Sequence, residues 1–298
     1  MDALLLVFSI IMNLLAYGVL RNEFCKKEVR CAADLHIFNA LYSVLSAVTL
    51  AIIALCTGSL CLPSMYTIAM GVGYGVITAL CAVFTMKGLE TGPLSYTNVI
   101  VSCGMVIPSL SGMLFFGESI SNGQYIGIAL MIVSIVCAVD NSNKGSGMSV
   151  RWLLLCLGAF LTNGLIGLMQ KIHQSSNFKG ELSAFLIIAF LFSAVYSLVS
   201  AFLGCKKGQK ITVMQSGRVK KLILFSVICG AGIAFCNHIN MYLAGVMQAI
   251  IFYPVVNGAS MLLNTIAGVA LWREKLSPKQ WLGLVTGGAA IILLCGIF

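Results

Sequence analysis

Ten long apolar runs follow one another along this chain, and they constrain its fold more than any other feature. Each run has roughly the 20 residues that an α-helix needs to cross the ~30 Å hydrocarbon core of a bilayer. A segment in lipid must satisfy its backbone hydrogen bonds internally, so we expect each run to form a helix. The sequence therefore predicts an all-α integral membrane protein with ten transmembrane helices. The runs cover residues 2–20, 35–56, 65–86, 93–116, 123–139, 152–170, 182–204, 222–243, 245–272 and 279–297.

The boundary between the eighth and ninth runs contains no polar loop. The chain reads Leu243-Ala244-Gly245 at that point. We divide the segment there because 222–272 is too long for one membrane-spanning helix and suits two.

Composition excludes the common classes of water-soluble protein. Of the 298 residues, 59% are hydrophobic and only 9% are charged, whereas soluble domains carry about 25% charged residues. Disordered chains and nucleic-acid-binding modules need far more charge than this. We therefore expect no soluble domain and no nucleic acid among the partners.

A polar segment near the middle of the chain separates two halves that repeat each other. Residues 1–140 are predicted to form a first five-helix repeat, 141–151 a polar linker, and 152–298 a second five-helix repeat. In the first helix of each half, Asn13 and Arg21 match Asn163 and Lys171, with the same spacing of eight. The strongest match is between Gly112-x5-Glu118-x-Ile120-Ser121-x2-Gln124-x2-Gly127 and, 156 positions later, Gly268-x5-Glu274-x-Leu276-Ser277-x2-Gln280-x2-Gly283.

An odd number of helices in each half determines how the second half enters the membrane. Five crossings bring the chain out on the opposite side, so the second half must be inverted relative to the first. Inverted repeats of this kind are related by a pseudo-two-fold axis, hold their site near the bilayer midplane, and allow alternating access to it.

Basic residues gather on one side of the predicted topology. The odd-numbered loops hold 16 of the 18 Lys and Arg residues, and the even-numbered loops hold only Lys171 and Lys179. The positive-inside rule then places the odd loops in the cytoplasm and both termini outside. We expect a multi-pass protein of the cell membrane, plasma or inner, with extracytoplasmic termini.

The ten-helix duplication and its junction motif resemble the drug/metabolite transporter (DMT) superfamily, EamA type. The resemblance covers essentially the whole chain, and the motif that carries it is G-x5-E-x-[IL]-S-x2-Q-x2-G. It implies a helical bundle whose central cavity is lined by the first, third and fourth helices of each repeat. It also implies secondary transport of small metabolites, amino acids, sugars or toxic compounds without ATP.

The chain departs from that pattern in two respects. Many members are described with cytoplasmic termini, whereas the basic residues here indicate the reverse. Small four-helix relatives carry a glutamate inside their first helix, where this chain has Asn13. Their carboxylate-based cation exchange is therefore not expected here.

All nine acidic residues fall at the ends of the apolar runs or between them, so no acid is expected at the midplane. A buried acid there would have indicated a cation or proton site. Glu118 and Glu274 are predicted to be structural. Each is expected to accept hydrogen bonds from the N-terminus of the next helix, which Ser121 or Ser277 caps.

Neutral polar side chains within the runs provide the candidate substrate-binding site. Asn13 and Asn163 lie near the centres of equivalent helices, although a buried amide can also serve only to join two helices. His238 is the candidate for a coupling proton, its alternative being a hydrogen-bonded histidine at a helix end. His36 and His173 are expected to be solvated. The remaining candidates are Tyr74, Tyr96, Asn98, Asn237, Asn240, Gln248, Tyr253 and Asn257.

No set of residues suited to catalysis can be assembled from the sequence. It has no nucleophile–His–Asp order, paired carboxylates or phosphate loop, and its cysteines lack the spacing of a zinc site. We expect neither an enzyme nor a bound cofactor or metal.

The prediction is a secondary transporter of a small polar metabolite such as an amino acid or a sugar. Its partners would be that substrate, membrane lipid and a coupling proton, and the protein would be a monomer or a homodimer. The alternatives left open are a multidrug or toxic-compound exporter, a lipid-linked-sugar flippase of the same superfamily, and a membrane enzyme or scaffold.

Overall fold

The computed structural model describes residues 2–91, 97, 100–101, 103–137, 150–206, 211–215, 217–272 and 277–294. Within these residues the secondary structure is helical, and they contain no strand. The predicted all-α class is confirmed. The predicted linker, 141–151, lies outside the described residues except for its last two positions, which begin a helix.

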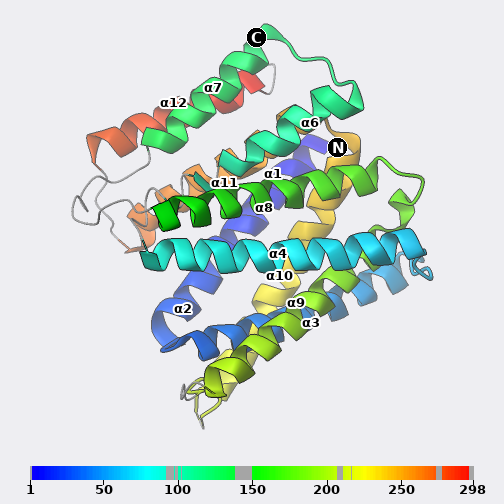
Figure 1. Ribbon diagram of the computed structural model, residues 1–298, viewed down its shortest axis with the longest axis vertical. Coiled ribbons are helices and arrows are strands. Elements are labelled where there is room, and N and C mark those ends of the chain that lie inside the picture. Colours follow the sequence, from blue (N-terminus) through cyan, green and yellow to red (C-terminus); the bar gives the residue numbers. More distant parts are fainter. Residues whose placement is uncertain are drawn as a thin grey trace. The chain divides into compact units, whose positions relative to one another are not determined.

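Each predicted apolar run contains a helix among the described residues (Figure 1). The elements before the linker are α1 (Asp2–Asn13), η1 (Leu14–Arg21), α2 (Asn22–Glu28), α3 (Ala32–Cys56), α4 (Met65–Thr91), η2 (Cys103–Met105), α6 (Val106–Phe116) and α7 (Asn122–Cys137). Those after it are α8 (Val150–Gln174), η3 (Lys179–Glu181), α9 (Leu182–Lys206), α10 (Val219–Val246), α11 (Ala249–Trp272) and α12 (Pro278–Leu294).

Among the described residues, six helical segments are long and apolar enough to cross a membrane. Two shorter apolar helices, Cys103–Phe116 and Ala249–Leu263, accompany them. The chain is thus a helical protein of the membrane type. The six segments are Asp2–Cys25, Ala32–Cys56, Met65–Thr85, Val150–Gln174, Lys179–Cys205 and Val219–Val246.

The helices form two compact units. The first unit contains Met1–Val76 and His173–Tyr242, and the second contains Ile77–Ile172 and Leu243–Phe298. Each unit therefore draws helices from both sequence halves.

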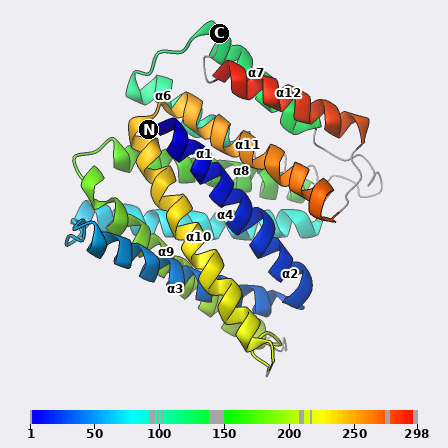
Figure 2. The same ribbon diagram turned by 180° about the vertical axis from the view of Figure 1, so that it is seen from behind.

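In the first unit, α3 and α9 lie side by side along their lengths (Figures 1 and 2). The hydroxyl oxygens of Ser43 and Ser193 are 3.4 Å apart across this contact. Helix α4 approaches α9 closely at Gly75, where an added Cβ would lie 2.9 Å from the Cβ of Phe192.

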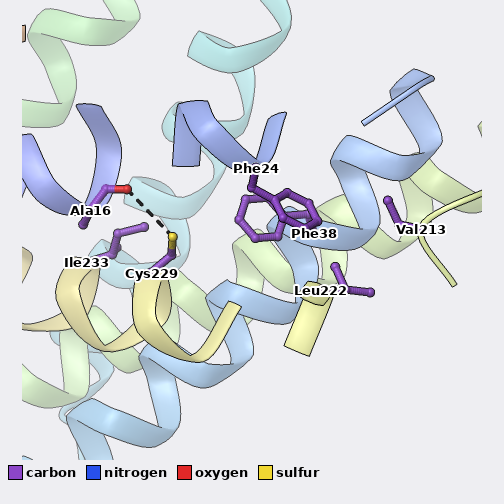
Figure 3. Packing of buried hydrophobic residues seen from close by; sticks show 7 residues of the cluster. All are labelled: Ala16, Phe24, Phe38, Val213, Leu222, Cys229 and Ile233. Carbon is purple, nitrogen blue, oxygen red and sulfur yellow. Dashed lines mark hydrogen bonds between the residues drawn. The ribbon is translucent and has the colours of Figure 1, made fainter. Parts of the chain in front are cut away.

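A cluster of buried hydrophobic residues, shown in Figure 3, lies within the first unit. The rings of Phe24 from α2 and Phe38 from α3 stack with centroids 4.2 Å apart. Val213 and Leu222 complete the cluster beside these rings, and Cys229 donates to the carbonyl oxygen of Ala16.

Two buried or half-buried carboxylates fasten the segments between helices of the first unit. Asp34 accepts hydrogen bonds from the backbone N–H groups of Thr212 (2.6 Å) and Val213 (3.1 Å), in the segment that precedes α10. Glu181 accepts from the backbone N–H (2.9 Å) and hydroxyl (2.8 Å) of Ser64, just before α4. Each carboxylate thus ties the start of one helix to the segment that precedes another helix distant in sequence.

Glu28, six residues before Asp34 in the chain, forms an ion pair with a partner that is exposed to solvent. Glu28 accepts a 2.8 Å hydrogen bond from Lys221, and Arg218 lies 3.8 Å away. The hydrogen bond from Lys221 holds the pKa of the Glu28 carboxyl below its usual value, although desolvation acts in the opposite direction.

In the second unit, α7 and α12 lie side by side (Figures 1 and 2). Ser134 donates to the carbonyl oxygen of Gly283 at 2.6 Å. A Cβ built on Gly127 would lie 3.2 Å from the carbonyl oxygen of Ala290, so the two backbones need glycine to approach this closely. Helices α6 and α11 also pack against each other in this unit.

The repeated Ser-x2-Gln motif forms the same local structure in both copies. The backbone N–H of Gln124 donates to the Ser121 hydroxyl (3.3 Å), and the Gln124 side chain accepts from the Ser121 N–H (3.0 Å). Ser277 and Gln280 repeat this pattern at 3.4 and 2.9 Å. Both are reciprocal capping boxes, so the predicted caps at Ser121 and Ser277 are confirmed.

Candidate functional site

In the first unit, two of the predicted asparagines join one polar cluster between α1 and α10. Ser9 donates to the Asn240 side-chain carbonyl, and Asn240 donates to the Cys236 sulfur at 3.5 Å. Asn13 also hydrogen-bonds the Cys236 thiol. Asn13 and Asn240 therefore share a partner, and the cluster contains amide, hydroxyl and thiol groups but no formal charge.

The helix changes its winding directly after Asn13. Residues Leu14–Arg21 form a π-helix, in which each bond spans five residues instead of four. Segments of this kind are rare and frequently mark functional positions. The cluster at Asn13 thus lies where the backbone of the first helix departs from regular α geometry.

The other predicted residues of the first unit have separate surroundings. Tyr74 is buried and its ring meets Phe185 edge-on, with centroids 5.2 Å apart. Asn237 donates to the carbonyl of Ile233 in its own helix at 2.9 Å. His238 is half-buried, and its Nδ1 atom has no hydrogen-bond partner among the described residues.

In the second unit, Asn163 and Tyr253 both hold α8 in place. The Asn163 amide donates to the carbonyl oxygen of Val101 at 2.9 Å, and the Tyr253 hydroxyl donates to that of Gly167 at 2.6 Å. Asn257 is exposed and donates to the carbonyl of Tyr253 in its own helix, and Gln248 is exposed. Tyr96 and Asn98 lie outside the described residues.

Glycines allow α8 to reach these partners. A Cβ built on Gly104 would lie 2.7 Å from the carbonyl oxygen of Phe160, and one on Gly164 would lie 2.8 Å from that of Gly104. Neither position has room for a larger side chain. The close approach brings the Asn163 amide within hydrogen-bonding distance of Val101.

Sequence reasoning missed a buried ion pair in the second unit. The Lys171 Nζ atom lies 2.9 Å from Glu118 Oε1, and the two side chains are only 7% and 9% exposed. Lys171 also donates to the carbonyl oxygen of Met247 at 3.0 Å, and its Nζ lies 5.7 Å from the centroid of the Phe116 ring. The assignment of Lys171 to a loop was wrong, because the residue belongs to α8 and is buried there.

The predicted partner of Glu118 was also wrong. Its carboxylate accepts hydrogen bonds from the backbone N–H groups of Ala249 (3.0 Å) and Ile250 (3.4 Å), at the start of α11 rather than of α7. The cause is the turn after α6. Gly117 adopts a left-handed conformation with φ +63°, and the backbone N–H groups of both Gly117 and Glu118 donate to the Gly112 carbonyl oxygen, the latter at 3.0 Å.

This turn explains the repeated glycine at the start of the junction motif. The turn folds the Glu118 side chain back over Gly112, where an added Cβ would lie 2.8 Å from the carboxyl carbon. The one sequence signal for the ion pair was the alignment of Lys171 with Arg21, which showed that a base recurs at this position.

The prediction that His173 is solvated was wrong as well. The side chain is fully buried, with Nε2 3.1 Å from the Thr67 hydroxyl and Nδ1 3.3 Å from the Gln174 amide nitrogen. The rings of Tyr66 and Phe185 lie against it. These aromatic residues exclude water from a helix end that the sequence alone places near solvent.

Comparison with known proteins identifies a similar fold but no activity. No protein-family model matches this chain. An uncharacterised protein of Haemophilus influenzae is 23% identical over 221 residues, which are 74% of this chain and 72% of that protein. A solved crystal structure superposes with a TM-score of 0.75 at 14% identity, covering 99% of this chain and 96% of the other. That likeness shows a shared fold alone.

Proposed function

We propose that this protein is a ten-helix secondary transporter of the DMT superfamily, EamA type, which moves a small polar metabolite by alternating access. One observation carries the proposal. Helices at equivalent places in the two sequence halves pair with one another in opposite directions. Inverted repeats related by a two-fold axis are expected to form such antiparallel pairs where equivalent helices lie beside the axis.

The contacts between α7 and α12 support such an axis in the second unit. At the repeat offset of 156, Gly127 corresponds to Gly283 and Ser134 corresponds to Ala290. Gly127 lies against Ala290, and Ser134 bonds Gly283, so each contact is the other with the two halves exchanged. Reciprocal contacts of this kind are the mark of two-fold symmetry, and their order makes the helices antiparallel.

The first unit supports the same relation through α3 and α9. The bounds Ala32–Cys56 and Leu182–Lys206 differ by 150 at both ends, which is also the offset between Asn13 and Asn163. Ser43 and Ser193 are therefore equivalent, and they contact each other. A residue that meets its own equivalent lies on the two-fold axis.

The contacts between helix ends support ten alternating crossings. Glu118 lies in the fourth junction, Lys171 in the last turn of α8 before the sixth, and Met247 between α10 and α11 at the eighth, and they meet. Asp34 of the first junction contacts Thr212 of the seventh, and Ser64 of the second contacts Glu181 of the sixth. Each contact joins junctions of the same parity, as expected if every helix crosses the membrane once.

The uncharged cluster around Asn13 and Asn240 favours a small neutral or zwitterionic substrate. Amide and hydroxyl groups both donate and accept hydrogen bonds, which suits an amino acid or a sugar. We expect proteoliposomes to take up at least one labelled compound of these classes faster than protein-free vesicles do.

Other outcomes of this experiment favour the alternatives. Absence of flux for every amino acid and sugar, with rapid scrambling of labelled lipid, would favour a flippase. Flux confined to lipophilic cations would favour a multidrug exporter. Either result would contradict the proposal that the substrate is a small polar metabolite.

The same proposal places both termini on the extracytoplasmic side of the cell membrane. The burial of Lys171 removes one of the two bases counted in even loops, which increases the bias that sets the orientation. Cys61 is exposed in the second junction, whereas Cys31 lies in the first. In intact cells a membrane-impermeant maleimide should therefore label Cys61, and Cys31 should react only after permeabilisation.

A variant with Cys56→Ser and Cys61→Ser is the control for this labelling, because Cys56 is exposed at the same end of α3. It should lose the label in intact cells. Labelling of Cys31 in intact cells, with Cys61 protected, would reverse the proposed orientation.

A further inference from the structure

The buried ion pair joins three helix ends within the second unit. Glu118 follows α6, Lys171 lies in the last turn of α8, and the pair binds the backbone at Met247, Ala249 and Ile250, where α11 begins. The end of α8 can separate from the other two only if Lys171 leaves both Glu118 and the Met247 carbonyl. The ends of α6 and α11 separate only if Glu118 also leaves Ala249 and Ile250. The pair is therefore the contact that opening at this point must break.

Stability alone does not account for a pair of this kind. Replacing a buried ion pair by well-packed apolar residues is often neutral or stabilising, because two charges must be desolvated. An ion pair has a different property that apolar residues lack. Once water enters, both charges are hydrated and the pair is worth at most about 1 kcal/mol, so separation then costs little. The ion pair is thus a strong contact when water is excluded and a weak one when water reaches it.

We propose that Lys171 and Glu118 form the latch of the gate at one end of the transport pathway. The latch holds α6, α8 and the start of α11 together in the closed state, and it opens when water reaches the pair. This inference rests on the proposed transport function, since a gate requires alternating access. It gives a role to the two residues that the repeat pattern singled out and the substrate cluster does not use.

The repeat also supplies a matched comparison. Glu274 is the sequence counterpart of Glu118, and it lies outside the described residues. In the proposed topology its junction is the ninth, on the opposite face from the fourth. A change at Glu274 should therefore not open the helix ends that Lys171 and Glu118 hold.

Hydrogen exchange of the purified full-length protein in lipid nanodiscs tests the latch without a substrate. Lys171→Met is the informative variant, because it removes the ion pair and leaves Glu118 free to accept the N–H groups of Ala249 and Ile250. We expect amides in 247–253 to exchange about tenfold faster, the change that about 1.4 kcal/mol in an opening equilibrium produces. Lys171→Arg, which keeps the charge, should retain most of the protection.

Three results would overturn the latch. They are wild-type exchange at 247–253 in Lys171→Met, an increase at 247–253 no larger than the increase in the other helices, and faster exchange at 247–253 in Glu274→Gln. The first means that the pair does not hold the junction, and the second means that it is only a general stabiliser. Because no flux is measured, failure of the latch is distinct from failure of the transport assay.

Discussion

Glu118→Gln is expected to lower the free energy of unfolding by about 3–5 kcal/mol, the usual cost of breaking a buried ion pair from one side. The variant leaves the charge of Lys171 buried beside a neutral amide. Lys171→Met should cost a similar amount, because the Glu118 carboxylate then keeps its backbone donors but loses its counter-ion. Thermal or denaturant unfolding of the purified protein in one fixed detergent measures both effects.

The double variant Glu118→Gln/Lys171→Met isolates the interaction energy of the ion pair from the other effects of each substitution. Neither charge remains buried in the double variant. Its loss of unfolding free energy should therefore be about 1–3 kcal/mol smaller than the sum of the two single losses. Glu28→Gln is the matched control, because Glu28 bonds Lys221, whose side chain is 61% exposed. That variant should lose at most about 1 kcal/mol. Equal effects of Glu118→Gln and Glu28→Gln, or additive single losses, would contradict the account of the buried pair.

The helices of this protein were predictable because each apolar run is a local property of the chain. The run 35–56 became α3 at Ala32–Cys56, and the run 182–204 became α9 at Leu182–Lys206. The division without a polar loop near residue 244 is also present, since α10 ends at Val246 and α11 begins at Ala249. The capping boxes were predictable for the same reason, because both partners lie within one helical turn.

The ion pair was not predictable in this way, because each charge is stabilised by residues far along the chain. A lysine at the edge of an apolar run indicates a loop unless a partner for its charge is known. That partner follows a different helix, and its carboxylate binds backbone 131 residues away. The left-handed turn at Gly117 turns Glu118 away from the helix that follows it, and only the folded backbone shows this.

The sequence predicted the types of residue in the candidate site but not the contacts that they make. Amides near the helix centres do make interhelical hydrogen bonds, but the partners of Asn163 and Tyr253 are backbone carbonyls, which every residue carries. Sequence periodicity gives no means of choosing among them. His173 was misplaced for a related reason, since the rings that bury it come from α4 and α9.

Asn13→Ala and Asn163→Ala are expected to reduce transport far more than they reduce stability. If an amide only joins two helices, it should contribute only about 0.6 kcal/mol to the free energy of unfolding, the average for hydrogen bonds between membrane helices. As groups that meet the substrate or set the helix next to it, each should lower flux by roughly tenfold or more, equivalent to about 1.4 kcal/mol. The two residues are equivalent in the repeat, so the two variants should behave alike even though they lie in different units.

The measurement pairs initial uptake into proteoliposomes with thermal unfolding of the same preparations. Asn122→Ala is the matched control, because this asparagine is exposed at the start of α7, and both quantities should stay at wild-type values. Unchanged uptake together with lower stability in Asn13→Ala and Asn163→Ala would show that the amides only join helices. The substrate would then have to meet other groups, of which His238 comes first, because its Nδ1 is buried without a partner among the described residues.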